Sequence, residues 1–315
     1  MAATEKHEIL LESGTNEVEI IEFYLGSQSF GINVHKLREI VPYDPDAVTR
    51  VPESIPSMIG MLLLRGQTVP LIDLREHLRK RQGERDLDTR KVVLVCEFNR
   101  EVNCFLVDGV NMIHRVSWKD MRPMDEFFTP YRPRFTGSIE VEGREIMIVD
   151  LEHVISEIFP EQADMIGQAE VPDDFKRDSR QDVKLMVAED SNIIRNQIVT
   201  ILQNSGYKQV TSFVNGEECY NALLALRDEM RNTGLDLSTR LNLLVSDIEM
   251  PSMDGLTLCR KVKTELGMKK LPVIMFSSLI NEQLAYKCKE VGADSHISKP
   301  QINELVKLVD GFCLK

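Results

Sequence analysis

The sequence predicts a multidomain chain, with an all-β N-terminal domain and an α/β C-terminal domain built on a doubly wound parallel sheet. Its 315 residues suit two domains, at about 150 residues per domain. Before residue 160, short strand-like runs are separated by Gly and Asn turns, whereas after residue 183 apolar runs alternate with helical periods. The acidic segment between them, with two prolines, is typical of a linker. The predicted divisions are a tail at 1–16, a β domain at 17–160, a linker at 161–182 and an α/β domain at 183–315.

The β domain is predicted from strand-like runs that meet at short turns, such as the turn at Gly66. A short helix is expected from Val34 to Val41, because Pro42 would end it. A second helix is expected from Asp150, as its cap, to Ile158. Many short strands at close spacing predict a small barrel or sandwich. The expected strand pairs lie at 18–25 with 30–32, 61–64 with 68–74, 92–98 with 102–107, and 137–141 with 146–149.

The α/β domain is predicted from a regular alternation of strand and helix. Such alternation implies a parallel sheet covered by helices on both faces. The segment 231–240 reads as a surface loop without chemistry. Strands are expected at 183–188, 209–213, 241–246, 272–276 and 295–297, and helices at 193–203, 217–230, 255–266, 281–291 and 301–312.

Composition excludes several classes of function. The net charge of −12 falls within the first 182 residues, because residues 183–315 hold equal numbers of acidic and basic side chains. No segment is basic enough to bind nucleic acid or an anionic membrane surface. The N-terminus has no signal-peptide pattern, no apolar run is long enough to span a bilayer, and the six cysteines form no CxxC pair. These features predict a cytoplasmic protein with reduced thiols.

Four apolar runs in the α/β domain end on residues that can handle a phosphoryl group: Glu189 with Asp190, Asp247, Ser277 and Lys299. Because ligands of open α/β sheets bind at the carboxyl ends of the strands, we expect these side chains in one pocket. The carboxylates suit Mg²⁺, and Asp247 could also accept phosphate as a nucleophile. The alternative is a buried ion network in which Lys299 only neutralises acids. Three carboxylates beside one lysine leave excess negative charge, which favours the Mg²⁺ interpretation.

This domain resembles the receiver domains of two-component systems. The resemblance rests on Glu189-Asp190, on Asp247 followed by Ile-Glu-Met-Pro-Ser-Met-Asp-Gly, on Ser277-Ser278 and on Lys299-Pro300. It implies that a histidine kinase phosphorylates Asp247 and that Ser277 and Lys299 sense the phosphate. It also implies Mg²⁺ ligands from Glu189, Asp190, Asp247 and the backbone carbonyl of Glu249. His296 stands where the family often has a switching aromatic residue, and a solvated surface histidine is the other interpretation of that position. The side chain of Glu249 could repel the hydrolytic water or reshape metal binding.

The N-terminal domain has no motif for a separate catalytic centre, so no enzyme is expected beyond self-phosphorylation and dephosphorylation at Asp247. It resembles the CheW-type coupling domains through Phe30-Gly-Ile-Asn-Val34, Leu64-Arg-Gly66, Val69-Pro-Leu-Ile-Asp-Leu74 and Val107-Asp-Gly-Val110. The resemblance implies two small SH3-like barrels that bind chemoreceptors and the kinase CheA.

The resemblance implies a surface that binds the receptor or kinase at Leu37, Glu39, Gly60 and Arg65, with Val34 nearby. Arg65 could anchor an interface or be a solvated hairpin charge. Leu37 would belong to the core if residues 34–41 were helical.

A coupling domain followed by a receiver resembles the CheV family of chemotaxis proteins. That resemblance implies a cytoplasmic adaptor, recruited to membrane-associated receptor arrays, in which phosphorylation of Asp247 by CheA adjusts the coupling of receptors to the kinase. The alternative is a phosphate sink that drains phosphoryl groups from CheA, with the N-terminal domain only localising it. A DNA-binding regulator is disfavoured because the N-terminal half is acidic and has no helix-turn-helix pattern.

Overall fold

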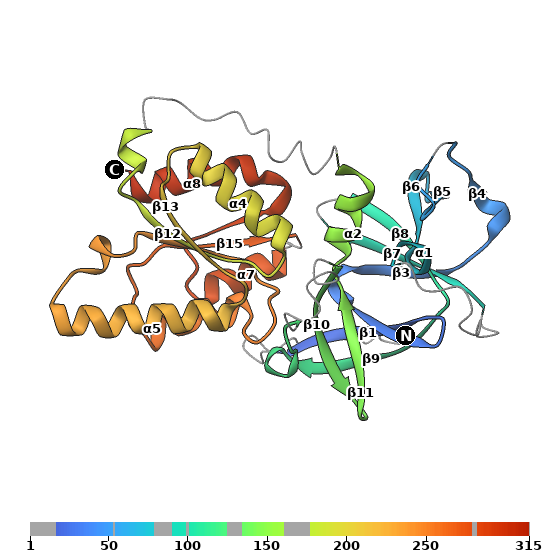
Figure 1. Cartoon of the computed structure of the whole chain (residues 1–315), viewed down its shortest axis with the longest axis horizontal. Helices are drawn as coiled ribbons and strands as arrows, with labels where there is room; N and C mark the ends of the chain where they lie inside the picture. Colours follow the sequence, from blue (N-terminus) through green and yellow to red (C-terminus); the bar gives the residue numbers. More distant parts are fainter. Residues whose placement is uncertain are drawn as a thin grey trace, which may run out of the picture.

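The structure is a computed structural model of the whole chain, and it places two domains side by side (Figure 1). It describes residues 17–52, 54–78, 90–98, 101–124, 134–160, 177–278 and 282–314. The predicted tail at 1–16 and most of the predicted linker, 161–176, lie outside the described residues. The N-terminal domain is built of β-sheets and the C-terminal domain is α/β, which confirms the predicted fold classes.

Two sheets form the N-terminal domain. The first has the order β10-β11-β2-β1-β9 and the second the order β3-β7-β8-β6-β5-β4. All of the predicted hairpins are present, and in one of them Arg65 and Gly66 adopt positive φ angles of 48° and 84° at the turn. The strands are β1 (Glu17–Leu25), β2 (Gln28–Asn33), β3 (Leu37–Pro42), β4 (Val48–Thr49), β5 (Met58–Leu64), β6 (Gln67–Asp73), β7 (Val92–Phe98), β8 (Glu101–Val107), β9 (Gly109–Ser117), β10 (Phe135–Val141) and β11 (Arg144–Val149).

Helix α2 (Leu151–Ile158) is the main helix among the described residues of this domain, beside the single turn α1 (Leu74–His77). Asp150 caps α2 as predicted, because its side chain accepts a hydrogen bond from the His153 amide at 3.0 Å. Leu151 and Val154 then pack against the main core of the domain, which includes Phe23, Phe30 and Phe105. The packing fixes the orientation of α2, and with it the direction of the side chains on its first turn.

The prediction of a helix from Val34 to Val41 was wrong. Only Val34–Lys36 form a 3-10 turn, capped by Asn33, and β3 then pairs antiparallel with β7. The apolar residues of this segment are compatible with a strand, and pairing with a buried neighbour overrides the weak local helix preference. The strand β9, which has no clean alternation, was not predicted; it pairs with β1 along almost its whole length.

The C-terminal domain is a five-stranded sheet of order β13-β12-β14-β15-β16 in which every pairing is parallel. In Figure 1, α4 and α8 lie over one face and α5 over the other. The domain has a hydrophobic core on each face of the sheet, in agreement with this arrangement of helices. On one face α4 and α8 bury Ile198 and Leu305, and on the other α5 and α6 bury Leu223 and Leu258. The elements are β12 (Lys184–Ala188), α4 (Asn192–Asn204), β13 (Gln209–Phe213), α5 (Gly216–Thr233), β14 (Leu243–Ser246), α6 (Gly255–Thr264), β15 (Val273–Ser277), α7 (Glu282–Glu290), β16 (Ser295–Ser298) and α8 (Ile302–Cys313).

Two boundaries differ from the predictions. The predicted loop at 231–240 begins inside α5, which ends at Thr233 before the left-handed Gly234, and it contains a 3-10 turn at Leu237–Thr239. Arg180, placed in the linker by the sequence, is 1% exposed and pairs with Asp310 of α8. The last residues of the predicted linker therefore pack as part of the C-terminal domain. No helix within the described part of the chain is both long and apolar enough to cross a membrane.

Candidate functional site

The predicted strand-end residues meet at the carboxyl edge of the parallel sheet. Asp247 follows β14 and is held there by a backbone bond from its amide to the Ala188 carbonyl, 2.8 Å long. Lys299 follows β16, and its Nζ lies 3.0 Å from Asp247 Oδ2 and 3.1 Å from Glu189 Oε1. Ser277 is buried at the end of the neighbouring strand β15. The sheet order thus brings the five predicted residues to one edge.

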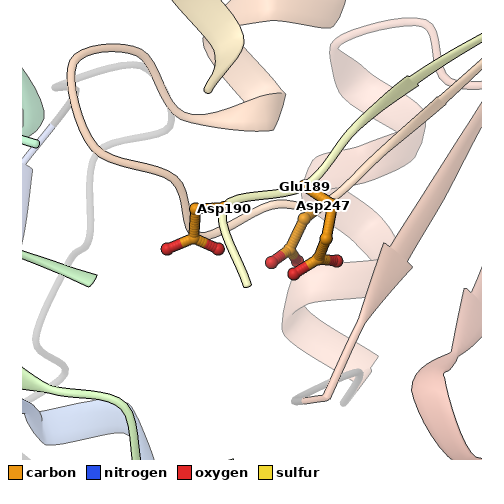
Figure 2. A group of neighbouring side chains, drawn as sticks. All are labelled: Glu189, Asp190 and Asp247. Atoms are coloured by element: carbon orange, nitrogen blue, oxygen red, sulfur yellow. The ribbon is translucent and has the colours of Figure 1, made fainter. Parts of the chain in front are cut away.

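Glu189, Asp190 and Asp247 form an acidic cluster whose members each offer a carboxylate oxygen within 4.8 Å of the others. Figure 2 shows the three carboxylates pointing to the same side of the strand ends. Burial, and then the charge of Asp247, raise the pKa values of Glu189 and Asp190 well above their usual range, while Lys299 opposes the rise. Burial also raises the pKa of Asp247. A single ammonium therefore does not offset the negative charge of the cluster.

This cluster fits Mg²⁺. Glu189 Oε2 is buried and has no hydrogen-bond partner among the described residues, although a buried carboxylate oxygen normally has one. Mg²⁺ binds oxygen ligands, commonly one or two carboxylates together with several waters. An ion here would satisfy the unpaired oxygen and offset the charge that Lys299 leaves over.

The loops around the cluster are fixed by contacts that the sequence did not reveal. Arg195 of α4 donates hydrogen bonds to the carbonyls of Glu189 and Asp190, at 2.8 and 3.3 Å, and so positions the acid pair. A Cβ on Gly255 would lie 1.9 Å from the Asp247 carbonyl oxygen, so only glycine fits at this position. Gly255 belongs to the motif after Asp247, which was the available signal, whereas nothing in the sequence singled out Arg195.

The N-terminal domain also contributes to the site, which the sequence did not predict. Glu152, on the first turn of α2, lies with its Oε2 3.5 Å from Lys299 Nζ, and its Oε1 lies 3.0 Å from Lys36 Nζ. Burial alone would raise the pKa of Glu152, but Lys299 and Lys36 outweigh it and lower the pKa to about 2. Glu152 is therefore an ionised carboxylate held between two lysines, one from each domain.

Glu249 makes a second link between the domains. Its Oε1 accepts a hydrogen bond from Asn33 Nδ2 at 2.7 Å and lies 3.8 Å from His35 Nδ1. The side chain of Glu249 thus contacts the N-terminal domain, whereas the sequence had suggested an effect on the hydrolytic water or the metal. His296 is exposed on β16.

The predicted coupling residues lie on the second sheet and beside it. Arg65, with 72% of its side chain exposed, donates a hydrogen bond to Glu39 of β3 at 2.8 Å. Gly60 is buried, and a Cβ there would lie 2.4 Å from the Thr49 carbonyl oxygen. Val34 and Leu37 pack partly buried against the main core of the domain. Glu39 and Arg65 therefore form an ion pair, whereas the apolar residues Val34 and Leu37 contribute to the packing of the domain.

Comparison with known proteins agrees with this two-part architecture. The family model of the CheW-like domain matches residues 19–159, and that of the response regulator receiver domain matches residues 185–310. A probable chemotaxis protein CheW of Rhizobium etli is 33% identical over 146 residues, which cover 46% of this chain and 92% of that protein. The chain belongs to the CheW-like family and carries a receiver domain after its CheW-like domain.

Relatives that match this chain across both domains are CheV chemotaxis proteins. Chemotaxis protein CheV3 of Helicobacter pylori is 28% identical over 295 residues, covering 90% of this chain and 91% of that protein. Chemotaxis protein CheV2 of the same organism is 25% identical over 311 residues, covering 93% of this chain and 94% of that protein. The chain thus has the architecture of a chemotaxis coupling protein of the CheV type.

Proposed function

We propose that this protein couples chemoreceptors to the histidine kinase CheA, and that phosphorylation of Asp247 by CheA adjusts the coupling. The observation that carries the proposal is the pocket of Glu189, Asp190, Asp247 and Lys299, on a receiver domain attached to a CheW-like domain. The CheW-like domain supports the coupling role, and the pocket supports the phosphoryl chemistry.

The chemistry is an in-line phosphoryl transfer. A carboxylate oxygen of Asp247 attacks the phosphorus of a phosphohistidine on the kinase, so that an O–P bond forms and the N–P bond breaks. The imidazole leaves with the electron pair and takes a proton from water. Lys299, whose Nζ lies 3.0 Å from Asp247 Oδ2, would bind an oxygen of the new phosphoryl group, and Ser277 is the proposed hydroxyl donor. Mg²⁺ held by Glu189, Asp190, Asp247 and the Glu249 carbonyl would offset charge on the phosphoryl oxygens.

Phosphotransfer from purified, radiolabelled CheA tests this chemistry. We expect label on the wild type in the presence of Mg²⁺ and none on Asp247→Asn, because an amide is not a nucleophile for phosphorus. Receptor, CheA and this protein are then reconstituted together to compare kinase control before and after phosphotransfer. Identical kinase control in wild type and Asp247→Asn would contradict the regulatory role. Rapid loss of phosphate with no change in kinase control would instead support the phosphate sink.

The proposed coupling surface has a matched test. Arg65 and Arg122 are both exposed arginines with a carboxylate partner at 2.8 Å, but Arg65 belongs to the predicted surface and Arg122 lies outside it. Arg65→Glu should weaken the binding of CheA or receptor by about tenfold or more, as the loss of an interface arginine often does. Arg122→Glu should leave the binding unchanged. Equal effects of the two variants would remove the assignment of Val34, Leu37, Glu39, Gly60 and Arg65 as a coupling surface.

A further inference from the structure

The phosphoacceptor edge of the receiver is covered by part of the CheW-like domain. We call three polar residues of that domain the receiver-facing surface: Asn33 at the end of β2, Lys36 in the 3-10 turn after it, and Glu152 at the start of α2. Asn33 and Glu152 contact the receiver directly, as does the neighbouring His35, whose Nδ1 lies 3.8 Å from Glu249 Oε1. Lys299 donates a hydrogen bond to Glu152, and Asn33 donates one to Glu249. Lys36 binds the other carboxylate oxygen of Glu152. One of these bonds goes to the lysine that also binds the phosphoacceptor.

Lys299 has no spare donor in this arrangement. An ammonium carries three N–H donors, and the Nζ of Lys299 has three carboxylate partners: Asp247 at 3.0 Å, Glu189 at 3.1 Å and Glu152 at 3.5 Å. A phosphoryl group on Asp247 brings three acceptor oxygens to the same ammonium. The longest of the three bonds, to Glu152, is the weakest and is the one that the phosphoryl group would replace.

The space at the contact is too small for a protein donor. The cavity enclosed by Asp247, Lys299, Glu152 and Asn33 measures about 40 Å³, enough for a few water-sized groups. A second cavity of about 170 Å³ opens beside Asp190 and Arg195. Asp247 does not line this second cavity, so the cavity by itself is no route to the phosphoacceptor. A histidine on the surface of a kinase domain needs the two domains to separate, whereas a small acyl phosphate needs only a local opening of the contact.

We propose that the receiver-facing surface of the CheW-like domain is a docking site for the receiver of the same chain, which shields Asp247 and is released when a phosphoryl group takes Lys299 from Glu152. The release step rests on the proposed phosphorylation of Asp247, whereas the docking itself does not. The phosphoryl group also adds negative charge beside the Glu152 carboxylate, which repels it. Phosphorylation therefore exposes both the receiver edge and the residues around Asn33 and Glu152 to other partners.

Distance measurements between spin labels in the full chain test the docking and its release. Five of the six cysteines are buried, so Cys313→Ser together with Met112→Cys and Tyr286→Cys gives one exposed label on each domain. Beryllium fluoride with Mg²⁺ serves as a phosphoryl analogue, and its binding is followed by fluorine NMR. We expect a single short distance without the analogue and a longer, broader distribution with it. An unchanged distance with the analogue bound would overturn the release.

Variants of the interdomain contact test the docking without any phosphoryl group. Asn33→Asp keeps the acceptor that caps the turn after β2, but it removes the donor to Glu249 and places two carboxylates against each other. We expect it to lengthen the label distance, and adding Glu249→Gln should restore the short distance. Glu157→Gln is the control, because Glu157 lies on α2 but pairs with Arg134 and His77 of its own domain. A short distance in Asn33→Asp would overturn the docking site.

Phosphotransfer rates separate shielding from docking alone. Asn33→Asp should accept phosphate from CheA about tenfold faster than wild type, the factor that corresponds to a shift of about 1.4 kcal/mol in the open population. Its rate with acetyl phosphate should change little, because that donor is small and needs only a local opening of the contact. Equal acceleration with both donors would overturn the shielding. No phosphorylation of the wild type by either donor would contradict the proposed function. The label distances of the variants, measured without the analogue, would still test the docking. A short distance that lengthens on dilution would assign the docked receiver to a second copy and overturn the assignment to one chain.

Discussion

Replacing Arg180 by leucine should destabilise the receiver domain strongly and leave the CheW-like domain unaffected. Arg180 lies three residues before the predicted start of the receiver and was assigned to a solvated linker by its sequence context. In the structure its guanidinium donates two hydrogen bonds to Asp310, at 2.9 and 2.7 Å, and one to the Ser205 carbonyl at 2.8 Å. Tyr207 donates a further bond to Asp310 at 2.6 Å.

The magnitude follows from the burial of this network. Arg180 is 1% exposed and Asp310 is 7% exposed, so the substitution leaves a buried carboxylate without the guanidinium that offsets its charge. Removing one partner of a buried ion pair costs about 3–5 kcal/mol, because the other charge stays buried without compensation. For a domain of this size we expect Tm to fall by roughly 10 °C or more. The double variant Arg180→Leu with Asp310→Leu should recover much of the loss, because it removes both charges.

The unfolding of each domain can be followed by a separate spectroscopic signal. Its single tryptophan, Trp118, lies in the CheW-like domain, whereas most of the described helical residues lie in the receiver. Thermal unfolding followed by circular dichroism at 222 nm should therefore shift in Arg180→Leu, while the Trp118 fluorescence transition should not. Lys208→Leu is the control, since Lys208 makes an exposed bond to Gln181 of the same segment and should change the stability by less than about 1 kcal/mol.

A small shift in Arg180→Leu, equal to that of Lys208→Leu, would refute the reasoning. It would mean that residues 177–182 do not contribute to the folded receiver and that the linker extends to residue 182, as the sequence predicted. A shift of both the fluorescence and the circular dichroism transitions would contradict the independence of the two domains in this respect.

Three further predictions concern the pocket and one buried carboxylate of the CheW-like domain. Glu189→Gln should weaken Mg²⁺ binding by about tenfold or more, measured as a smaller rise of the receiver's Tm with added Mg²⁺; an unchanged rise would remove Glu189 from the ligands. Gly255→Ala should lower both that Tm and phosphotransfer to Asp247, because the new methyl group displaces the backbone of Asp247; a variant with wild-type Tm and transfer would contradict the tight contact. Burial raises the pKa of Glu22, but its hydrogen bonds, among them those from His114 and Asn111, outweigh burial and lower the pKa to about 2. The ionised group thus stabilises the fold above about pH 4.5, and this contribution disappears as the pH falls toward 2. Glu22→Gln should be less stable than wild type at pH 6, and the difference in Trp118 fluorescence melts should shrink on acidification; a difference independent of pH would refute the assignment.

The receiver pocket was predictable because its residues share one local signal. Each lies at the carboxyl end of a strand or directly after it, and the order of a parallel sheet then determines that the strand ends meet. Asp247, Glu189 and Lys299 therefore needed no knowledge of long-range packing beyond the fold class. Arg195 was missed because its role is to bind backbone carbonyls from a helix, and an arginine on a helix surface has no distinguishing pattern.

The prediction of a helix after Asn33 was wrong for a related reason. Residues 34–41 have no period that separates a helix from a strand, and their conformation is decided by pairing with β7, which lies more than 50 residues further along the chain. The burial of Arg180 was not predicted because a short charged stretch is expected to be solvated. Its partner Asp310 lies some 130 residues away in the sequence, and nothing local indicates it. In both cases the deciding contact joins distant parts of the chain.

Glu152 shows the limit of local patterns most clearly, because its sequence context suggests a different role. An acidic residue on the first turn of a helix is expected to stabilise that helix through a favourable interaction with its dipole. Nothing in the local sequence suggests a partner in another domain. The structure instead places it between Lys36 and Lys299, so that its charge is offset from both domains. Separation of the domains removes the Lys299 partner and leaves Glu152 paired with Lys36 of its own domain, so the docked state gains only the second ion pair. The energy of the docked state therefore depends on how well Lys299 is occupied elsewhere, and a phosphoryl group on Asp247 would change that occupancy directly.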